Sequence, residues 1–486
     1  MKKNKKLYIF SIIIICILSY LIVNKVLEND TFSAIKIGNY ILDNGIDFKE
    51  HFNIQSNLSY HNARWLFNVI IALIYNHFGF LGIYIFTILT TITMGICIFN
   101  ILLKINKKIN LSLLVTLFII LISKIFLSAR AQIISYLLFL LEIYFIEMLI
   151  KTNKKRYIVY IVISSILISN IHTTVWPMTL IVFIPYFIEY LFYKFKLTKK
   201  EGRLYTEITS IKLLIISFVL TIFSGLATPL GLTPYTYMFK TMSGFSKTFI
   251  TELQVSNPFT IPSLFVLTII YIYFLIYRKG KIKVSDLFLV IGLYIMGALA
   301  IRNLAFLFIL CYISLYRIIY NSIDNEYIEK LTKYLSIKTI YILSCSMLLI
   351  LSFEYHIIKV SNKDYIEEKS YPINATNYIL KNVDVDSMRI YNHFNFGSYL
   401  EFNGIKVFLD SRSEVYCEEF NNTRILKDWY ISSHGNINYN LTFDKYDITH
   451  ALLYNNEIIN NYIKEDKNYK LLYKDDYFSF YERVKE

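Results

Sequence analysis

The sequence has few cysteines and lacks the common catalytic signatures of soluble enzymes. It holds only 5 cysteines in 486 residues, and Cys417 alone lies outside the apolar runs, so neither a disulfide framework nor a cysteine-based metal site can be drawn. It contains no Walker A sequence, no G-x-S-x-G elbow and no H-E-x-x-H helix. These absences exclude P-loop ATP hydrolysis, serine hydrolysis on a nucleophile elbow and zincin chemistry.

Long apolar runs dominate what is present. Hydrophobic residues make up 55% of the chain, and runs of membrane-spanning length recur, which ordinary soluble folds do not show. The first run is longer than a signal-peptide core and no small-residue cleavage site follows it, so we interpret it as an uncleaved span. About eleven spans are predicted, at 7–24, 81–103, 110–127, 132–150, 157–171, 174–193, 211–227, 260–277, 285–301, 304–320 and 338–354.

The net charge of +14 is divided unevenly along the chain. Residues 355–486 contain 16 Lys and Arg against 20 Asp and Glu, a net charge of −4, so the remainder carries +18. The basic residues of that remainder lie in short clusters between apolar runs, as in cytoplasmic loops, and no nucleic-acid-binding motif accompanies them. Nucleic acid is therefore not an expected partner.

The basic clusters also predict the orientation in the membrane. The run 65–78 reaches only roughly 21 Å as a helix against a hydrocarbon core of about 30 Å, so we interpret it as an interfacial helix. With a cytoplasmic N-terminus, every strongly basic loop is then cytoplasmic, whereas all of them would lie outside if this run crossed. The basic clusters are at 104–108, 151–156, 194–203 and 278–283. The outer side receives the loop 25–64, Arg130, His172, the loop 228–259, Arg302 and residues 355–486.

The last part of the chain has the composition of a small folded domain. Residues 355–486 are predicted to form an extracytoplasmic α/β domain after a transmembrane domain of residues 1–354. Asp410 and Arg412 follow a predicted strand here, and their residue types favour a local ion pair, while the strand-end position makes them candidate ligand contacts. Strands are predicted at 388–394, 405–411, 448–454, 469–474 and 477–484, and helices at 374–382, 414–431 and 456–466.

Several short motifs carry a resemblance to a known superfamily. They are "DTFSAIKIGNYILDNG", "ARWLFNVIIALIYNHFGFLG", "SARAQIISYLLF", "SNIHTT", "ITELQVSNPF" and "FNFGSYLEFNGIKVFLDSRSEVY". With a first span, an outer loop bearing an acidic residue, many spans and an outer C-terminal domain, the chain resembles the GT-C superfamily of membrane glycosyltransferases. That superfamily includes protein O-mannosyltransferases, lipid A aminoarabinose transferases and oligosaccharyltransferases. The motifs are most similar to a bacterial subgroup without an assigned substrate.

The resemblance implies roles for particular residues. An acidic residue of the first outer loop serves the superfamily as catalytic base or metal ligand, often within an adjacent pair, and here Asp30 stands alone between Asn29 and Thr31. The same residue is predicted to cap a helix over 31–43. Glu252 is a second candidate ligand for a divalent metal. The candidate phosphate- and substrate-binding residues are Arg130, His172, Arg302, Glu252, Asp410 and Arg412.

These features predict a multi-pass plasma-membrane glycosyltransferase. It would transfer a sugar from a polyprenyl-phosphate donor to an extracytoplasmic acceptor, which is a cell-envelope glycan, a glycolipid or a protein. The donor would arrive through the lipid phase, because no cytoplasmic domain is large enough to bind a nucleotide sugar. The alternatives are a transporter or flippase of lipid-linked glycans, a polysaccharide polymerase or ligase that uses a diphosphate-linked glycan, and a non-catalytic GT-C-like protein of envelope assembly.

Overall fold

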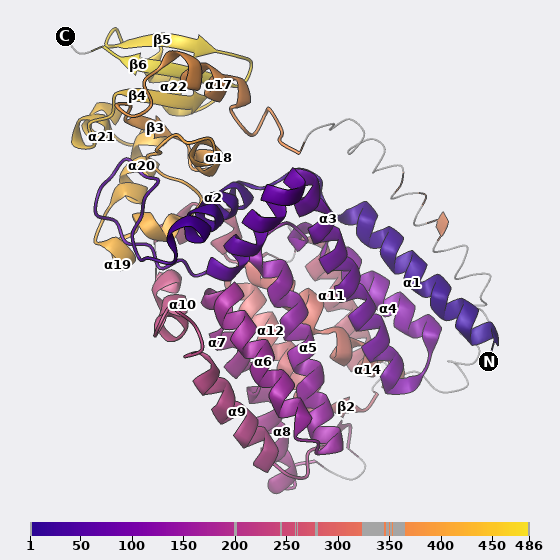
Figure 1. Ribbon diagram of the computed structural model, residues 1–486. Helices are drawn as coiled ribbons and strands as arrows, with labels where there is room; N and C mark the ends of the chain where they lie inside the picture. Colours follow the sequence, from indigo (N-terminus) through magenta and orange to yellow (C-terminus); the bar gives the residue numbers. More distant parts are fainter. Residues whose placement is uncertain are drawn as a thin grey trace. The chain divides into compact units, whose positions relative to one another are not determined.

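The structure is a computed structural model in which the chain forms two compact units (Figure 1). It describes residues 2–198, 202–243, 245–257, 259, 261–277, 280–322, 345–346, 349, 352 and 365–484. The first unit comprises Met1–Asn24, Tyr84–Tyr235 and Ile250–Lys363, and the second comprises Lys25–Ile83, Thr236–Phe249 and Asp364–Glu486. The boundary predicted between residues 354 and 355 lies outside the described residues.

The first unit is a bundle of apolar helices. Helix α5 packs along α6, α1 along α4, and α8 along α12, as Figure 1 shows. A short parallel strand pair, β1 (Leu204–Tyr205) and β2 (Ile282–Lys283), joins two of the connections. Among the described residues, the α-helices that lie wholly in this unit are α1 (Lys2–Ile22), α4 (Ile109–Ile122), α5 (Ala131–Thr152), α6 (Arg156–Ile171), α7 (Pro177–Ile181), α8 (Ile184–Lys194), α9 (Lys212–Ser224), α11 (Pro262–Ile272), α12 (Val284–Leu299), α13 (Leu304–Leu310) and α14 (Tyr312–Ser322), and the later part of α3 (Trp65–Asn106) also belongs to it.

Every predicted span within the described residues coincides with helix, and the run at 338–354 falls mostly outside them. In the part of the chain that the structure describes, four segments are long and apolar enough to cross a membrane: Lys5–Ile22, Trp65–Ile105, Ala131–Thr152 and Thr173–Lys194. The pair Ile301–Leu310 and Tyr312–Ser322, bent by 50°, would make a fifth, and the other apolar helices have 10 to 17 residues. The chain is thus a multi-pass membrane protein, and the count of about eleven spans stays a prediction.

Helix α3 (Trp65–Asn106) contains a break at Gly79. The backbone there has φ 61° and ψ −158°, a conformation open essentially to glycine alone. The apolar run 65–78 is therefore a helix of its own, which ends where the predicted span at 81–103 is about to begin.

The second unit is built on a mixed four-stranded sheet. Its strands are β3 (Ile390–Asn392), β4 (His450–Tyr454), β5 (Tyr469–Lys474) and β6 (Phe478–Arg483), in the order β3-β4-β6-β5. Strands β3 and β4 are parallel and the other pairs are antiparallel. The associated helices are α2 (Asn29–Asn44), α17 (Ile373–Asn382), α18 (Gly397–Phe402), α19 (Glu418–Asn421), α20 (Ile425–Ser433), α21 (Tyr439–Lys445) and α22 (Ile458–Ile463), while α10 (Thr233–Ser243) and the 3-10 turn η3 (Phe245–Thr248) come from the middle of the chain.

Two predicted elements of this unit are wrong in detail. The segment 405–411 is not a strand: Val407 forms an isolated parallel bridge, and the next two residues bond to the Asn392 side chain, whose Nδ2 donates to the Leu409 carbonyl at 2.8 Å and whose Oδ1 accepts from the Phe408 N–H at 2.9 Å. The predicted helix 414–431 is divided into a 3-10 turn, η7 (Ser413–Tyr416), and the helices α19 and α20. Asn422 separates these two helices with a left-handed backbone, φ 51°.

The segment 25–64 is hydrogen-bonded to the C-terminal part within this unit. The Ile54 N–H donates to the Val407 carbonyl at 2.9 Å and the Val407 N–H donates to the Phe52 carbonyl at 3.1 Å. Arg389 adds a bond from its guanidinium to the Ile54 carbonyl at 2.9 Å. Helix α2 also packs against α18. The loop therefore folds as part of the sheet-containing unit.

Candidate functional site

Arg130 begins the candidate site of the first unit. It precedes α5 at the N-cap position, and its Nη1 donates to both oxygens of Glu252, at 2.8 and 3.1 Å. Glu252 lies in the 3-10 turn η4 (Thr251–Leu253). The two side chains are 22% and 50% exposed. The guanidinium is thus oriented by a carboxylate that water can also reach, so this pair can be opened by a competing anion.

His172 lies at the same end of α5. It follows the last residue of α6 and is only 6% exposed. Its Nδ1 is 3.0 Å from the hydroxyl of Ser135, which is on α5 about one turn beyond Arg130. The neighbouring Asn170 donates from Nδ2 to the Ala227 carbonyl at 2.9 Å. The chain around His172 is therefore held against α5 and against the turn that follows α9.

Arg302 is linked to this region through the backbone. It sits in the 3-10 turn η6 (Ile301–Asn303), whose first N–H donates to the carbonyl of Gln254 at 3.0 Å, and its side chain is exposed. Turn η6 thus lies against η4, which bears Glu252. The segments that carry four of the predicted site residues therefore meet at the N-terminal end of α5. These residues are Arg130, His172, Glu252 and Arg302. Two arginines and a histidine in one region are suited to binding a phosphate.

Asp30 belongs to the second unit, in the first turn of α2. Asp30 was predicted to be the N-cap residue, and this is wrong, because α2 begins at Asn29 and its N-cap residue is Glu28. The Oδ2 atom of Asp30 accepts a hydrogen bond from Nη1 of Arg64 at 3.2 Å, and the side chains of Asp30 and Arg64 are only 12% and 15% exposed. A carboxylate in the first turn is also stabilised by the helix dipole.

The loop that follows β3 lies beside this turn. Asn29 donates from Nδ2 to the Phe394 carbonyl at 2.9 Å. His393 directly precedes Phe394 in this loop. Its Nδ1 accepts a hydrogen bond from the Asn395 N–H at 3.0 Å, so the neutral ring carries its proton on Nε2. That nitrogen is 3.4 Å from Oε1 of Glu457, which follows β4. The two residues therefore lie at the carboxyl ends of the parallel strands, where open sheets commonly bind ligands.

Burial keeps this pair neutral. It lowers the pKa of His393 to about 3 and raises the pKa of Glu457 to about 8. Among the described residues, neither oxygen of the Glu457 carboxyl has a hydrogen-bond partner, and the same holds for the indole nitrogen of Trp429. The rings of His393 and Trp429 are 5.2 Å apart. The cluster can offer hydrogen bonds from buried, uncharged groups beside aromatic surfaces.

Asp410 and Arg412 form a buried network with two further acids. Both are fully buried; Nε of Arg412 donates to Asp410 at 3.0 Å and Nη1 donates to Glu50 at 2.6 Å. Glu401 Oε2 accepts from Nη2 at 3.3 Å. Burial would raise the pKa of Asp410, but the adjacent guanidinium outweighs it and lowers that pKa, whereas burial raises the pKa of Glu401. The network connects the first loop, through Glu50, to residues 401–412.

The candidate metal ligands are both paired with arginine. Asp30 bonds to Arg64 and Glu252 to Arg130. Within the described part of the chain, no three His, Cys, Asp or Glu side chains are grouped so that they could hold a metal ion. An arginine on each carboxylate opposes cation binding, so these two residues, the possible ligands of a divalent metal, do not fit that role.

Sequence reasoning missed the partners of the predicted residues. Arg64 was detectable, since it is a basic residue on the predicted outer side, the feature that singled out Arg130 and Arg302. Ser135 and Glu457 carried no comparable signal, because an isolated serine in an apolar helix and an acid in a polar loop are both common. Only their contacts in the fold reveal them.

Comparison with known proteins supports the fold. No protein-family model and no curated protein sequence matches the chain. Among solved structures it is similar to the archaeal oligosaccharyltransferase AglB from Archaeoglobus fulgidus, in complex with an inhibitory peptide and a dolichol-phosphate. The match has a TM-score of 0.60 at 8% sequence identity and covers 92% of this chain and 69% of AglB. At this identity the likeness concerns the fold alone: the chain has a fold similar to that of this oligosaccharyltransferase, as expected for a GT-C-like architecture.

Proposed function

We propose that the protein is a membrane glycosyltransferase that transfers a sugar from a polyprenyl-phosphate donor to an extracytoplasmic acceptor. The observation that carries the proposal is the convergence of the segments bearing Arg130, His172, Glu252 and Arg302 at one end of α5. AglB, which has a similar fold, was solved with a dolichol-phosphate, a lipid phosphate of the proposed donor class.

The arginines are assigned to the donor phosphate. Arg130 binds a carboxylate through a single guanidinium nitrogen that contacts both oxygens, and a phosphate presents oxygens of similar geometry. A donor phosphate would displace Glu252, whose side chain is half exposed. As the bond between the sugar C1 and the phosphate oxygen breaks, charge builds on the phosphate, and Arg130 and Arg302 would stabilise it.

Asp30 is assigned as the general base. Its carboxylate would take the proton of an acceptor hydroxyl, the hydroxyl oxygen would form a bond to C1 of the sugar, and the lipid phosphate would leave with the bonding electron pair. Inversion at C1 follows from this direct displacement. Arg64 holds Asp30 through a hydrogen bond of 3.2 Å and is assigned as its positioning residue.

The acceptor is assigned to the loops after β3 and β4. The indole N–H of Trp429 and the protonated carboxyl of Glu457 can donate to acceptor oxygens, and both are buried without a partner among the described residues. The aromatic rings beside them can pack on a sugar or an aliphatic surface.

The decisive comparison is between Asp30→Asn and Asp43→Asn. Asp43 lies on the same helix but is exposed near its end, so its amide variant controls for the lost charge. Purified proteins would be given radiolabelled polyprenyl-phosphate sugars and crude envelope acceptors. We expect Asp30→Asn to lower the transfer rate by about 10²- to 10⁴-fold, the usual contribution of a general base, and Asp43→Asn to leave it unchanged.

The other outcomes are equally informative. Undiminished transfer by Asp30→Asn would remove Asp30 as the base while leaving the transferase assignment in place. Absence of transfer by the wild-type protein from every donor of this class would overturn the proposed function. In that case reconstituted vesicles loaded with fluorescent lipid-linked glycan would test the alternative of a flippase.

A further inference from the structure

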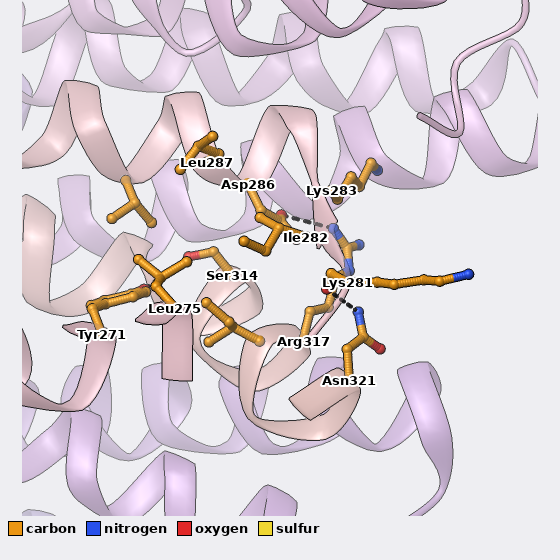
Figure 2. Close-up of a pocket in the computed structure, with 12 residues that line it drawn as sticks. Tyr271, Leu275, Lys281, Ile282, Lys283, Asp286, Leu287, Ser314, Arg317 and Asn321 are labelled. Carbon is orange, nitrogen blue, oxygen red and sulfur yellow. Dashed lines mark hydrogen bonds and ion pairs between the residues drawn. The ribbon is translucent and has the colours of Figure 1, made fainter. Parts of the chain in front are cut away.

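A small open pocket lies in the first unit at the start of α12. Residues from α11, β2, α12 and α14 line it, and Figure 2 shows Leu275 and Leu287 on its apolar side and Arg317 and Lys281 on its polar side. These residues take no part in the candidate site at the N-terminal end of α5. The charge pattern predicts that this end of the bundle is cytoplasmic.

The helical segments that form the apolar side of the pocket also expose apolar side chains. Leu275, Leu287 and Val290 form part of the wall. The helices that supply them expose large apolar side chains nearby: Ile276 is 66% exposed and Ile295 is 58% exposed. In a bilayer such surfaces contact acyl chains, so a hydrocarbon chain can enter the pocket from the membrane.

The polar side is rich in cations. Lys281, Lys283 and Arg317 line the pocket, and Asp286 is the acidic side chain lining it. The Lys283 ammonium group forms ion pairs with the carboxylates of Glu147 and Glu207, at N···O distances of 3.1 and 3.0 Å. Arg317 Nη1 bonds to Asp286 at 2.9 Å, which is drawn as a dashed line in Figure 2. These ion pairs fix the floor of the pocket, whereas the Lys281 side chain extends from its mouth and is exposed.

A second cation, Arg203, is bonded to the backbone of the pocket wall. The Arg203 guanidinium donates to the carbonyls of Leu275 and Gly280, at 2.5 and 3.4 Å, and the residue is exposed. The Leu275 carbonyl belongs to a π-helical segment, Tyr273–Tyr277, and such segments are frequent at functional sites. Gly280 allows β2 to approach α14, since a Cβ there would lie 2.3 Å from the Ser322 hydroxyl oxygen. The local backbone is therefore shaped to bring two cations beside an apolar pocket.

We propose that this pocket binds an anionic phospholipid of the bilayer. The headgroup phosphate would lie between Lys281 and Arg203, and the acyl chain would lie along Leu275, Leu287 and Val290. Cytoplasmic leaflets carry anionic lipids, and basic pockets between membrane helices on that side bind their headgroups. This proposal is independent of the proposed transferase function, because it uses none of the residues assigned to that reaction.

The test is lipid binding by the purified full-length protein, measured by native mass spectrometry. Phosphatidylglycerol and phosphatidylcholine with the same acyl chains would be titrated onto the wild type, Lys281→Gln and Lys155→Gln. Lys155 is an exposed lysine of another predicted cytoplasmic loop and serves as the matched control. We expect Lys281→Gln to bind phosphatidylglycerol about fivefold more weakly, with phosphatidylcholine binding and Lys155→Gln unchanged.

A pocket-filling variant tests the acyl-chain side. Val290→Trp should weaken phosphatidylglycerol binding without any change of charge, because the pocket wall would be filled. Equal losses in Lys281→Gln and Lys155→Gln, or no loss in Lys281→Gln, would overturn the proposal. Displacement of the lipid by millimolar inorganic phosphate would identify free phosphate as the occupant and would equally overturn it.

Discussion

At the scale of single residues, the second unit buries titratable groups in two different ways. Arg412 places one guanidinium among three carboxylates, so that at least part of the charge is compensated inside the protein. Among the described residues, His393 and Glu457 have no such partner of fixed charge, and burial keeps both neutral. Removing one member of a buried ion pair typically costs about 3–5 kcal/mol, so the Arg412 network stabilises the fold only as a complete set.

The neutral pair predicts an unusual dependence of stability on pH. The pKa of Glu457 is raised from 4.5 to about 8, so the folded state holds a proton that the unfolded state releases, and stability falls as pH rises through this window. The pKa of His393 is lowered from 6.5 to about 3, so stability rises with pH between these values. The two effects oppose one another between pH 4.5 and 6.5, and Glu457 acts alone from pH 6.5 to 8.

Glu457→Gln isolates this effect. The opening free energy of β4, from hydrogen exchange, should fall by up to about 1.4 kcal/mol per pH unit between pH 6.5 and 8 in the wild type and stay flat in the variant. Glu465→Gln, at an exposed acid just after α22, is the control that should keep the wild-type slope. A wild-type profile that is already flat above pH 6.5 would mean that Glu457 is ionised in the folded protein.

At the scale of secondary structure, apolar runs were predicted more reliably than polar elements. A long apolar run has no stable alternative to helix in a membrane, so the runs at 132–150 and 157–171 coincide with α5 and α6. The segment 405–411 has a strand pattern, but after a single bridge at Val407 the Asn392 side chain bonds to the Phe408 N–H and the Leu409 carbonyl. The loss of the predicted strand thus depends on a contact between residues that are distant in the sequence, and a local residue pattern cannot predict such a contact.

For the candidate site, individual residues could be predicted from the sequence, but their contacts with one another could not. Charge asymmetry across the membrane singled out Arg130 and Arg302, since an arginine on the outer side runs against the usual bias. Whether such residues lie close together depends on how turns η4 and η6 pack against each other, and the spacing of residues along the sequence does not predict this packing. The pairing of Asp30 with Arg64 likewise joins residues 34 positions apart.

The break in α3 gives a prediction at this scale. Gly79→Ala should destabilise the protein by about 1–3 kcal/mol, because φ 61° with ψ −158° is strained for any residue with a Cβ. No described residue lies within 4 Å of a Cβ at Gly79, so the cost would come from the backbone alone. Gly292→Ala in α12 is the matched control: it has the same free space and a helical backbone, and should be neutral or stabilising by up to about 1 kcal/mol. Thermal unfolding of both variants measures the difference, and equal midpoints would contradict a strained break.

At the scale of the whole molecule, the fold is shared with AglB at 8% identity. Such divergence is tolerated because a membrane bundle requires apolar surfaces and close packing more than particular side chains. Function then rests on the few polar residues that the bundle carries. Their side of the membrane decides which substrates they can meet, so the predicted orientation is the property of the whole chain that most needs a measurement.

Labelling of single cysteines tests this orientation. In a background whose native cysteines are replaced by serine, Ser56→Cys in the first loop should react with a membrane-impermeant maleimide added to intact cells. Lys104→Cys should react only after permeabilisation, because it lies in the last turn of α3, in a basic cluster that the positive-inside rule places in the cytoplasm. Both positions are exposed, so accessibility on the correct side is assured for each. Labelling of Lys104→Cys from outside would show that the run 65–78 crosses the membrane. The basic loops that follow would then face outward, and the donor phosphate could not meet Arg130 and Arg302 on the outer face.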